Sequence, residues 1–299
     1  MIYSMQVKGG SFMSIYFTDT DCEMWYTDVD KLGINVIKMP YTLDGVEYYY
    51  DMGRDTDFKK LNQRMREGST PTTSALNPQD YIDYFEPFFA KGEDILYVHF
   101  SDKMSGTFDY MNTALNILKE KYPKRVVRTI NTRSISYGAG MQALEAGKLH
   151  KEGKSDQEIM EYMDEFSKHI STNFVVDNLA HLKRGGRISA TTAIVGGLLN
   201  IKPILKVNDD GVIDKVGTGK GMKKALLNII EEMKGNIDKI EKYPVYVLDA
   251  DNKDMASWLE EEIKKSIAGV KTERYPIGPV IGAHCGPGTC GVVYYGKHR

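Results

Sequence analysis

Short apolar segments alternate with longer amphipathic ones in the middle of the chain, and this alternation limits the possible folds more than any other feature. EDILYVHF at 93–100 has the composition of a buried strand, and 101–123 after it has helical periodicity. KRVVRTINT at 124–132 predicts a second strand, followed by predicted helices at 134–153 and 155–170. Parallel strands need crossover connections of about this length, so the pattern predicts a parallel sheet covered by helices.

Three segments outside this region have their own predicted structure. INVIKMPYTL at 34–43 reads as one strand that ends at an Asp-Gly turn. ATTAIVGGLLN at 190–200 is apolar and predicts a helix. The apolar runs on either side of NDDG, within 202–221, predict a β-hairpin. An antiparallel pair in the second half indicates a mixed architecture there.

The length of 299 residues is sufficient for two domains. We expect an α/β fold with an N-terminal parallel-sheet α/β domain at 13–170 and a C-terminal mixed α+β domain at 171–299. The regular pattern begins at MSIYFTD, so we expect residues 1–12 to be an extension outside the fold.

Composition excludes several classes of function. The net charge is −2 without long blocks of either sign, so nucleic acid is not an expected partner. No apolar run reaches the roughly 20 residues that a membrane span requires. The start of the chain does not have the pattern of a signal peptide, and three cysteines do not form a disulfide framework. The expected compartment is the cytoplasm.

A first candidate site follows the predicted strand that ends at Phe100. Ser105, Gly106 and Thr107 stand where the next helix begins. In an open α/β sheet, ligands bind beyond the carboxyl ends of the strands, and a helix start attracts a carboxylate or phosphate. The alternative is that Ser105 or Thr107 only caps the helix.

A second hydroxyl-rich loop, TPTTSALNP, also precedes a predicted helix. It supplies Thr72, Thr73 and Ser74. Each could serve only in a turn, whereas convergence of the two loops would bind one anionic head group.

The segment LKRGGRIS combines a glycine pair with a compact positive cluster. Lys183, Arg184 and Arg187 flank glycines that allow a sharp turn. Cations are also favourable at a helix C-terminus, which is the simpler explanation. An arginine there could instead bind a carboxylate or phosphate in bidentate fashion.

GAHCGPGTCG, at 282–291, raises the question of a metal or redox site. Cys285 and Cys290 have four residues between them, unlike the two of a C-x-x-C motif, and a zinc site would need a distant fourth ligand beside His284. We therefore predict no metal here, and favour a tight, anion-binding turn at 286–289.

These motifs, in this order, resemble the DegV family of bacterial fatty-acid-binding proteins. The matching segments are FTDTDCE, TTSALNP, SDKMSGTF, LKRGGRIS and GAHCGPGTCGVVYYG. The resemblance implies two domains with a long-chain fatty acid in a tunnel between them. It also implies a lipid-binding carrier subunit, which presents the carboxylate to a separate fatty acid kinase subunit for acyl phosphate formation and phospholipid synthesis.

The same resemblance implies a set of site residues and no catalytic residue, metal or cofactor. Thr73 and Ser105 would bind the carboxylate, and Arg187 (or Arg184) and His284 would lie near the head group where the kinase docks. The full predicted ligand-binding set is Thr73, Ser105, Gly106, Thr107, Arg187 and His284. The alternative function is a small-molecule phosphotransferase or hydrolase that uses His284.

Overall fold

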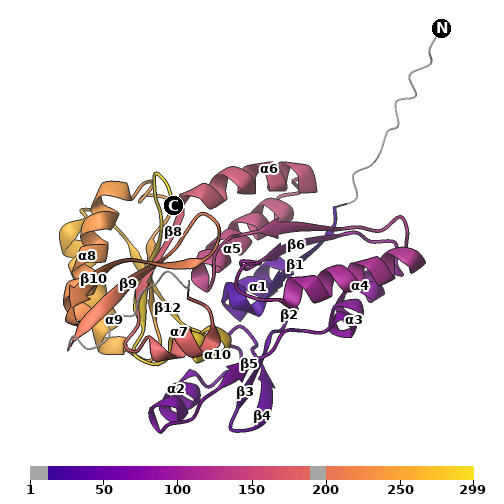
Figure 1. Ribbon diagram of the computed structural model, residues 1–299. Helices are drawn as coiled ribbons and strands as arrows, with labels where there is room; N and C mark the ends of the chain where they lie inside the picture. Colours follow the sequence, from indigo (N-terminus) through magenta and orange to yellow (C-terminus); the bar gives the residue numbers. More distant parts are fainter. Residues whose placement is uncertain (1–12, 189–199) are drawn as a thin grey trace.

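The computed structural model describes residues 13–188 and 200–299 (Figure 1). The extension predicted at 1–12 lies outside the described residues, as does almost all of the helix predicted at 190–200.

The first half of the chain forms a parallel sheet, as the alternating pattern predicts. Its strand order is β2-β1-β6-β7, and every neighbouring pair is parallel. The strands are β1 (Ile15–Asp19), β2 (Asn35–Ile37), β6 (Ile95–His99) and β7 (Val127–Asn131).

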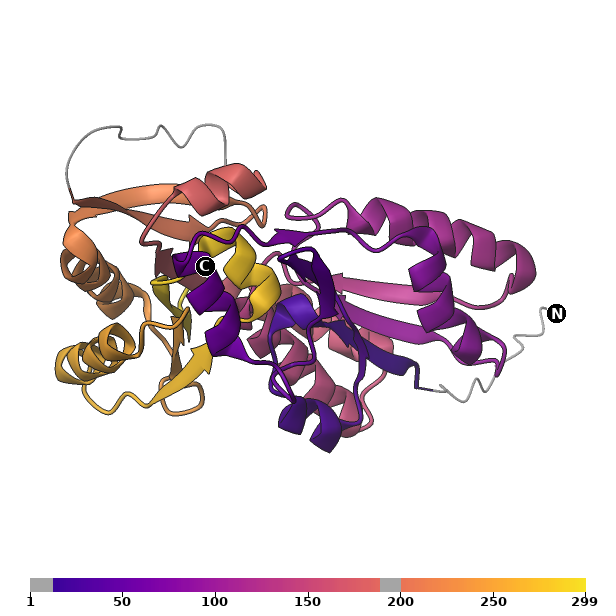
Figure 2. The ribbon, with the colours of Figure 1, turned by 90° about the horizontal axis from the view of Figure 1, so that it is seen from below.

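Helices cover both faces of this sheet. Successive side chains of β1 point to opposite faces, so neighbouring residues contact different helices. Phe17 packs edge-on against Phe85 and Phe88 of α3, with ring centroids 5.7 and 5.3 Å away. Tyr16 donates a 2.7 Å hydrogen bond to the Ala143 carbonyl of α5 on the other side. The helices are α1 (Tyr26–Leu32), α3 (Pro78–Phe89), α4 (Thr107–Lys121), α5 (Tyr137–Lys151) and α6 (Asp156–Phe166), and two views show the layers (Figures 1 and 2).

The second half forms a six-stranded mixed sheet. Its order is β10-β9-β8-β13-β11-β12, in which only the β11–β12 pair is parallel. The strands are β8 (Ile170–Val175), β9 (Ile201–Val207), β10 (Ile213–Lys220), β11 (Val245–Asp249), β12 (Thr272–Pro276) and β13 (Cys290–Tyr295). The predicted hairpin is confirmed as β9–β10. One face packs against α8 (Gly221–Asn236) and α9 (Lys253–Ser266) through a separate apolar cluster.

The strand predicted at 34–43 is wrong, because it is two strands in different sheets. After β2 the chain leaves the parallel sheet, and the Met39 amide donates to the Thr20 hydroxyl instead of a strand. β3 (Pro40–Leu43) then pairs with β4 (Val46–Tyr49) and β5 (Thr72–Thr73) in a small antiparallel sheet. Alternating apolar residues continue through the break, which hides it in the sequence.

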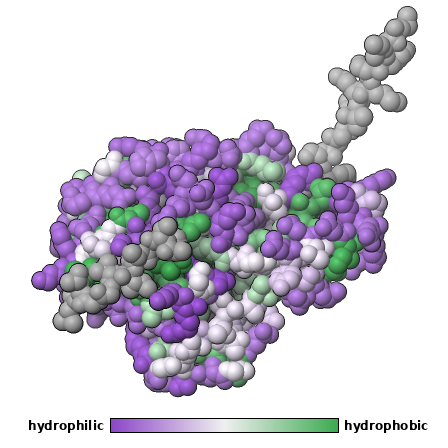
Figure 3. Space-filling view, viewed as in Figure 1, coloured by the Kyte–Doolittle hydropathy of each residue, from purple (hydrophilic) through white to green (hydrophobic). Residues whose placement is uncertain are grey.

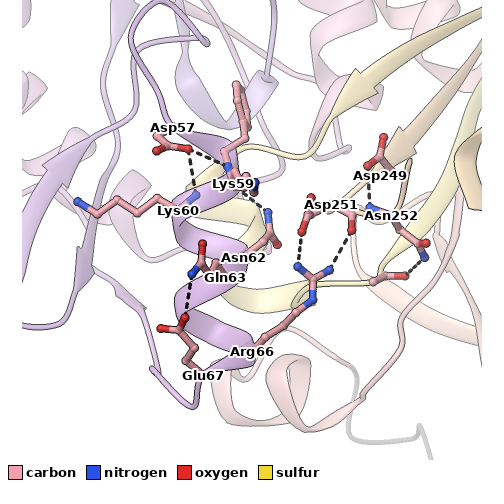
Figure 4. Close-up of polar contacts among 12 residues, drawn as sticks. Asp57, Lys59, Lys60, Asn62, Gln63, Arg66, Glu67, Asp249, Asp251 and Asn252 are labelled. Carbon is pink, nitrogen blue, oxygen red and sulfur yellow. Dashed lines mark hydrogen bonds and ion pairs between the residues drawn. The ribbon is translucent and has the colours of Figure 1, made fainter. Parts of the chain in front are cut away.

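The helix α2 (Phe58–Arg66) joins this small sheet to the second half of the chain. Arg66, at its end, forms an ion pair with Asp251 and also donates to the Asp251 carbonyl at 2.9 Å (Figure 4). Asn252, next along the chain, donates to the Gly288 carbonyl at 2.8 Å. Leu61 and Met65 of α2 share a buried cluster with Leu43 of β3, so the small sheet is tied through α2 to the segment after β11.

One hydrophobic core extends through both halves. Phe17 and Tyr97 of the parallel sheet belong to the same buried cluster as Phe174 and Leu248 of the mixed sheet. The face drawn in Figure 3 is mainly hydrophilic, with apolar residues in separate small patches. The largest buried cluster therefore contains residues of both sheets.

Candidate functional site

A cavity lies where residues of the parallel sheet, the small sheet and the mixed sheet meet. Together with its open mouth, it comprises about 870 Å³ of space not filled by protein atoms. Its apolar lining consists of Met39, Phe100, Met104, Ile135, Phe174, Leu182, Ile213, Leu248, Ile277, Val280 and Ile281. Its polar and sulfur-bearing lining consists of Asp21, Thr73, Ser74, Ser105, Ser136, Thr172, Arg187, His284, Cys285 and Thr289.

Ser105 lines this cavity at the start of α4. Its hydroxyl oxygen accepts a 3.2 Å hydrogen bond from the Thr107 amide, so it does have the local turn role that the sequence left open. A hydroxyl that accepts in this way still has its own hydrogen to donate. The capping contact and contact with a ligand are therefore compatible.

Thr73 and His284 form a direct pair across the cavity wall. The Thr73 Oγ1 atom lies 2.8 Å from Nε2 of His284, which is on α10 (Pro279–Cys285). Burial and the positive charge of Arg187 lower the pKa of His284 to about 4. The imidazole is therefore neutral at physiological pH.

Two glycines make room for histidine rings beside the cavity. Gly185 ends α7 (Ala180–Gly185), and a side-chain carbon at this position would overlap the His284 ring. Gly286 has a φ of +78°, and a side chain there would crowd the ring of His181. The glycines of LKRGG and HCGPG are thus required by close packing between the two segments.

Arg187 lines the cavity, while Arg184 is exposed on α7 and is not among the lining residues. The Arg187 guanidinium donates to the Met104 carbonyl through Nε at 3.0 Å and also to the Gly185 carbonyl. These bonds fix its position between α7 and the Ser105 loop.

Gly106 and Thr107 stand beside the lining rather than in it. Gly106 is exposed at the N-cap of α4, and Thr107 is buried. The Thr107 hydroxyl lies 2.8 Å from the Tyr81 hydroxyl and accepts from the Leu76 amide at 3.2 Å. It joins α4 to the segment before α3.

Three buried carboxyl groups, at the end of β1 and in the turn after it, were not expected from the sequence. Asp19 accepts from the Tyr97 hydroxyl and the Phe100 amide, and burial raises its pKa to about 6. Glu23 accepts from the Ser136 hydroxyl and from the Gly278 amide at 2.5 Å, and burial raises its pKa to about 8.

The third of these carboxyl groups belongs to Asp21, which lines the cavity. It has only 6% of its surface exposed, and burial together with the neighbouring Asp19 and Glu23 raises its pKa. FTDTDCE has the composition of a solvated acidic turn. The only signal in the sequence was the position of Asp21 shortly after an apolar strand.

The cysteines in the C-terminal motif are free, buried thiols. Burial raises the pKa of Cys285 and of Cys290 to about 12, which keeps both protonated and unreactive as nucleophiles. Within 13–188 and 200–299, no three His, Cys, Asp or Glu side chains are grouped to hold a metal ion.

The turn after α10 is tight, but it is less suited to an anion than we expected. The amide of Gly286 donates to the Gly282 carbonyl, and that of Gly288 donates to the Ala250 carbonyl. Pro287 has no amide hydrogen. The two glycine amides of the turn therefore serve the fold itself.

A family model described as "Uncharacterised protein, DegV family" matches residues 16–297. The chain belongs to the DegV family. A DegV domain-containing protein of Clostridium perfringens is 34% identical over 293 residues, which cover 95% of this chain and 98% of that protein. Among the helices of the described residues, none is both long and apolar enough to cross a membrane.

Solved DegV structures share the whole fold. One is described as showing fatty acid binding of a DegV family protein from Thermus thermophilus. It has a TM-score of 0.81 and 29% identity, and the match covers 95% of this chain and 100% of that one. Another, described as DegV, a fatty acid binding protein from Bacillus subtilis, has a TM-score of 0.81 and 26% identity, with 96% and 100% covered.

Proposed function

We propose that this DegV protein binds a long-chain fatty acid in the cavity and presents its carboxylate to a separate fatty acid kinase subunit in the cytoplasm. The resulting acyl phosphate would then enter phospholipid synthesis. The observation that carries the proposal is a mostly apolar cavity with a hydroxyl–imidazole pair and an arginine in its wall. The fatty-acid-binding relatives support it. We also propose the division into domains at 13–170 and 171–299, with the cavity between them.

The energetics of such a complex are favourable. Burial of an alkyl chain contributes about 0.8 kcal/mol per methylene, which amounts to on the order of 10 kcal/mol for a long-chain acid. The carboxylate must not be buried without partners, because an unpaired buried charge is very costly. Ser105 and Thr73 would supply hydroxyl donors, and Arg187 a positive charge.

A neutral His284 imidazole can donate or accept at Nε2, depending on which ring nitrogen carries the proton. If Nε2 carries the proton, the imidazole donates to the Thr73 oxygen, and the Thr73 hydroxyl can donate to the carboxylate. His284 would therefore act as a positioning residue for Thr73.

Native mass spectrometry of the purified protein tests the binding half of this proposal. We expect a fatty acid to accompany the protein, and the delipidated protein to take up palmitate or oleate. Protein that is reproducibly free of lipid and takes up neither acid would refute it.

The kinase half is tested with a reconstituted kinase and ATP. We expect Arg187→Ala to lower acyl phosphate formation more than it lowers fatty acid affinity, because the guanidinium faces the head group. Arg184→Ala, an exposed position outside the lining, tests docking alone, and Lys264→Ala on the exposed side of α9 is the control. Equal rates for the Arg187 variant and the wild type would contradict the role of Arg187.

A second candidate is a small-molecule hydrolase or phosphotransferase. The 2.8 Å contact between Thr73 and His284 is the observation in its favour, since it has the geometry of a nucleophile and its base. Turnover of ATP or an ester by the isolated protein, abolished in His284→Ala, would establish this function in place of the carrier.

A further inference from the structure

Asp21 is a buried acid without a hydrogen-bond partner in the part of the chain that the structure describes. Its Oδ1 atom is buried and unpaired there, although the residue lines the cavity. Glu23, two residues later, is equally buried but has both Ser136 and Gly278 as donors. A buried polar group without a partner is costly, so a ligand is the natural partner for Asp21.

Asp21 lines the cavity from the 3-10 turn Thr20–Cys22, which follows β1. At the same end of the parallel sheet, the Asp19 carboxylate accepts a 3.2 Å hydrogen bond from the amide of Phe100, the residue after the partner strand β6. Ser105 lies on the loop that continues from Phe100, and both residues line the cavity. Asp21 and Ser105 therefore belong to the same edge of the parallel sheet.

Electrostatics agree with this position. The charge of Arg187 lowers the pKa of His284 and also opposes the rise in the pKa of Asp21, so the guanidinium acts on both groups. Burial, Asp19 and Glu23 together outweigh Arg187 and raise the pKa of Asp21. A raised pKa favours the protonated form of a carboxyl group, and that form has an O–H to donate.

We propose that Asp21, as a neutral carboxylic acid, donates a hydrogen bond to the carboxylate of the bound fatty acid. The inference rests on the proposed fatty acid function and adds a head-group ligand to Thr73, Ser105 and Arg187. No covalent step is involved. An acid–carboxylate pair is a charge-assisted hydrogen bond, which is stronger than one between neutral groups.

Two substitutions distinguish hydrogen-bond donation by Asp21 from simple filling of space by its side chain. Asp21→Asn retains a donor of the same shape, so we expect palmitate affinity within about threefold of the wild type near pH 6. Asp21→Leu removes the donor, and we expect affinity to fall about tenfold or more. Ile213→Val, at an apolar lining position, is the control for a small change in the cavity wall.

Carbon-13 NMR of palmitate labelled at its carboxyl carbon reports the contact directly. We expect the carboxyl resonance of the complex to move in Asp21→Asn and to stay in place in Ile213→Val. This measurement also serves if Asp21→Leu does not fold. An unmoved resonance, or equal losses of affinity in the Asn and Leu variants, would overturn the inference.

The pH dependence supplies a third measurement. Besides the ligand, the charged groups that act on Asp21 are Asp19, Glu23 and Arg187. An ionised Asp21 would repel the carboxylate, so wild-type affinity should fall relative to Asp21→Asn as rising pH ionises Asp21. A constant ratio would contradict the donor role. Wild-type protein that binds no palmitate at any pH would instead refute the proposed function.

Discussion

The two halves of the chain contribute different chemistry to the same cavity. In the first half, the lining residue Ser105 retains a hydroxyl hydrogen, and Asp21 has an oxygen without a partner among the described residues. In the second half, the Thr289 hydroxyl is bonded to carbonyls of its own turn, while Phe174 and Leu248 present apolar surface. Under the proposed function, the first half therefore supplies polar groups with bonding capacity left, whereas the second half supplies most of the apolar wall together with Arg187 and His284.

The largest expected effect comes from making the apolar wall polar. Leu248→Asp places a carboxylate in the buried wall of β11, where an unpaired charge is very costly. We expect fatty acid affinity to fall at least about 100-fold, measured by titration of a fluorescent fatty acid. Leu248→Ile, which conserves volume, is the control and should stay close to the wild type. Tight binding by the Asp variant would contradict burial of the acyl chain against the wall formed by β11.

The second prediction concerns Glu23, which connects the two halves. Burial raises its pKa to about 8 in the folded protein, from the ordinary value of about 4.5, so the folded state holds the proton more tightly. Stability should therefore fall as pH rises from about 4.5 to 8 and level off above that. In Glu23→Gln this contribution should disappear, a difference on the order of 2–4 kcal/mol by denaturant unfolding at pH 5 and pH 8. Identical pH profiles for both proteins would contradict it.

The third prediction tests whether the glycine pair serves the head-group side. Gly185→Ala should displace His284 and break its contact with Thr73, lowering fatty acid affinity about tenfold, as expected for loss of a hydrogen bond to a charged group. Gly235→Ala, on α8 with open space around it, is the matched control. Titration of both variants should separate them clearly; equal affinities would show that His284 does not support Thr73.

The smallest effect is expected for Ser105→Ala. Loss of one of several donors should weaken binding about three- to tenfold. Because the amide of the buried Thr107 also loses its acceptor, stability should fall by about 1 kcal/mol. The same titration measures the affinity. Unchanged affinity would remove Ser105 from the head-group ligands.

Much of the fold could be predicted from the sequence because its periodicity is local. The strand ending near Phe100 and the helix that begins at Thr107 follow from neighbouring residues, and so does the β9–β10 hairpin. The break at Met39 could not be predicted, because it depends on a hydrogen bond to Thr20, nineteen residues earlier in the chain.

Prediction of the candidate site from the sequence is limited in the same way, by contacts between residues far apart in the chain. Ser105 and Thr73 stood out because hydroxyl groups precede predicted helices. The buried state of Glu23 depends on Ser136 and Gly278, which are 113 and 255 residues away. No local pattern in FTDTDCE distinguishes such a carboxyl group from a solvated one.

The shared core of the two sheets determines how the molecule should respond to heat. Because Phe17 and Phe174 belong to one buried cluster, neither half can lose its packing without exposing apolar surface of the other. The chain should therefore melt in one cooperative transition. A bound lipid would then raise a single melting temperature. The stabilisation grows with the logarithm of the ratio of free lipid to its dissociation constant, so thermal unfolding reports how far the site is occupied.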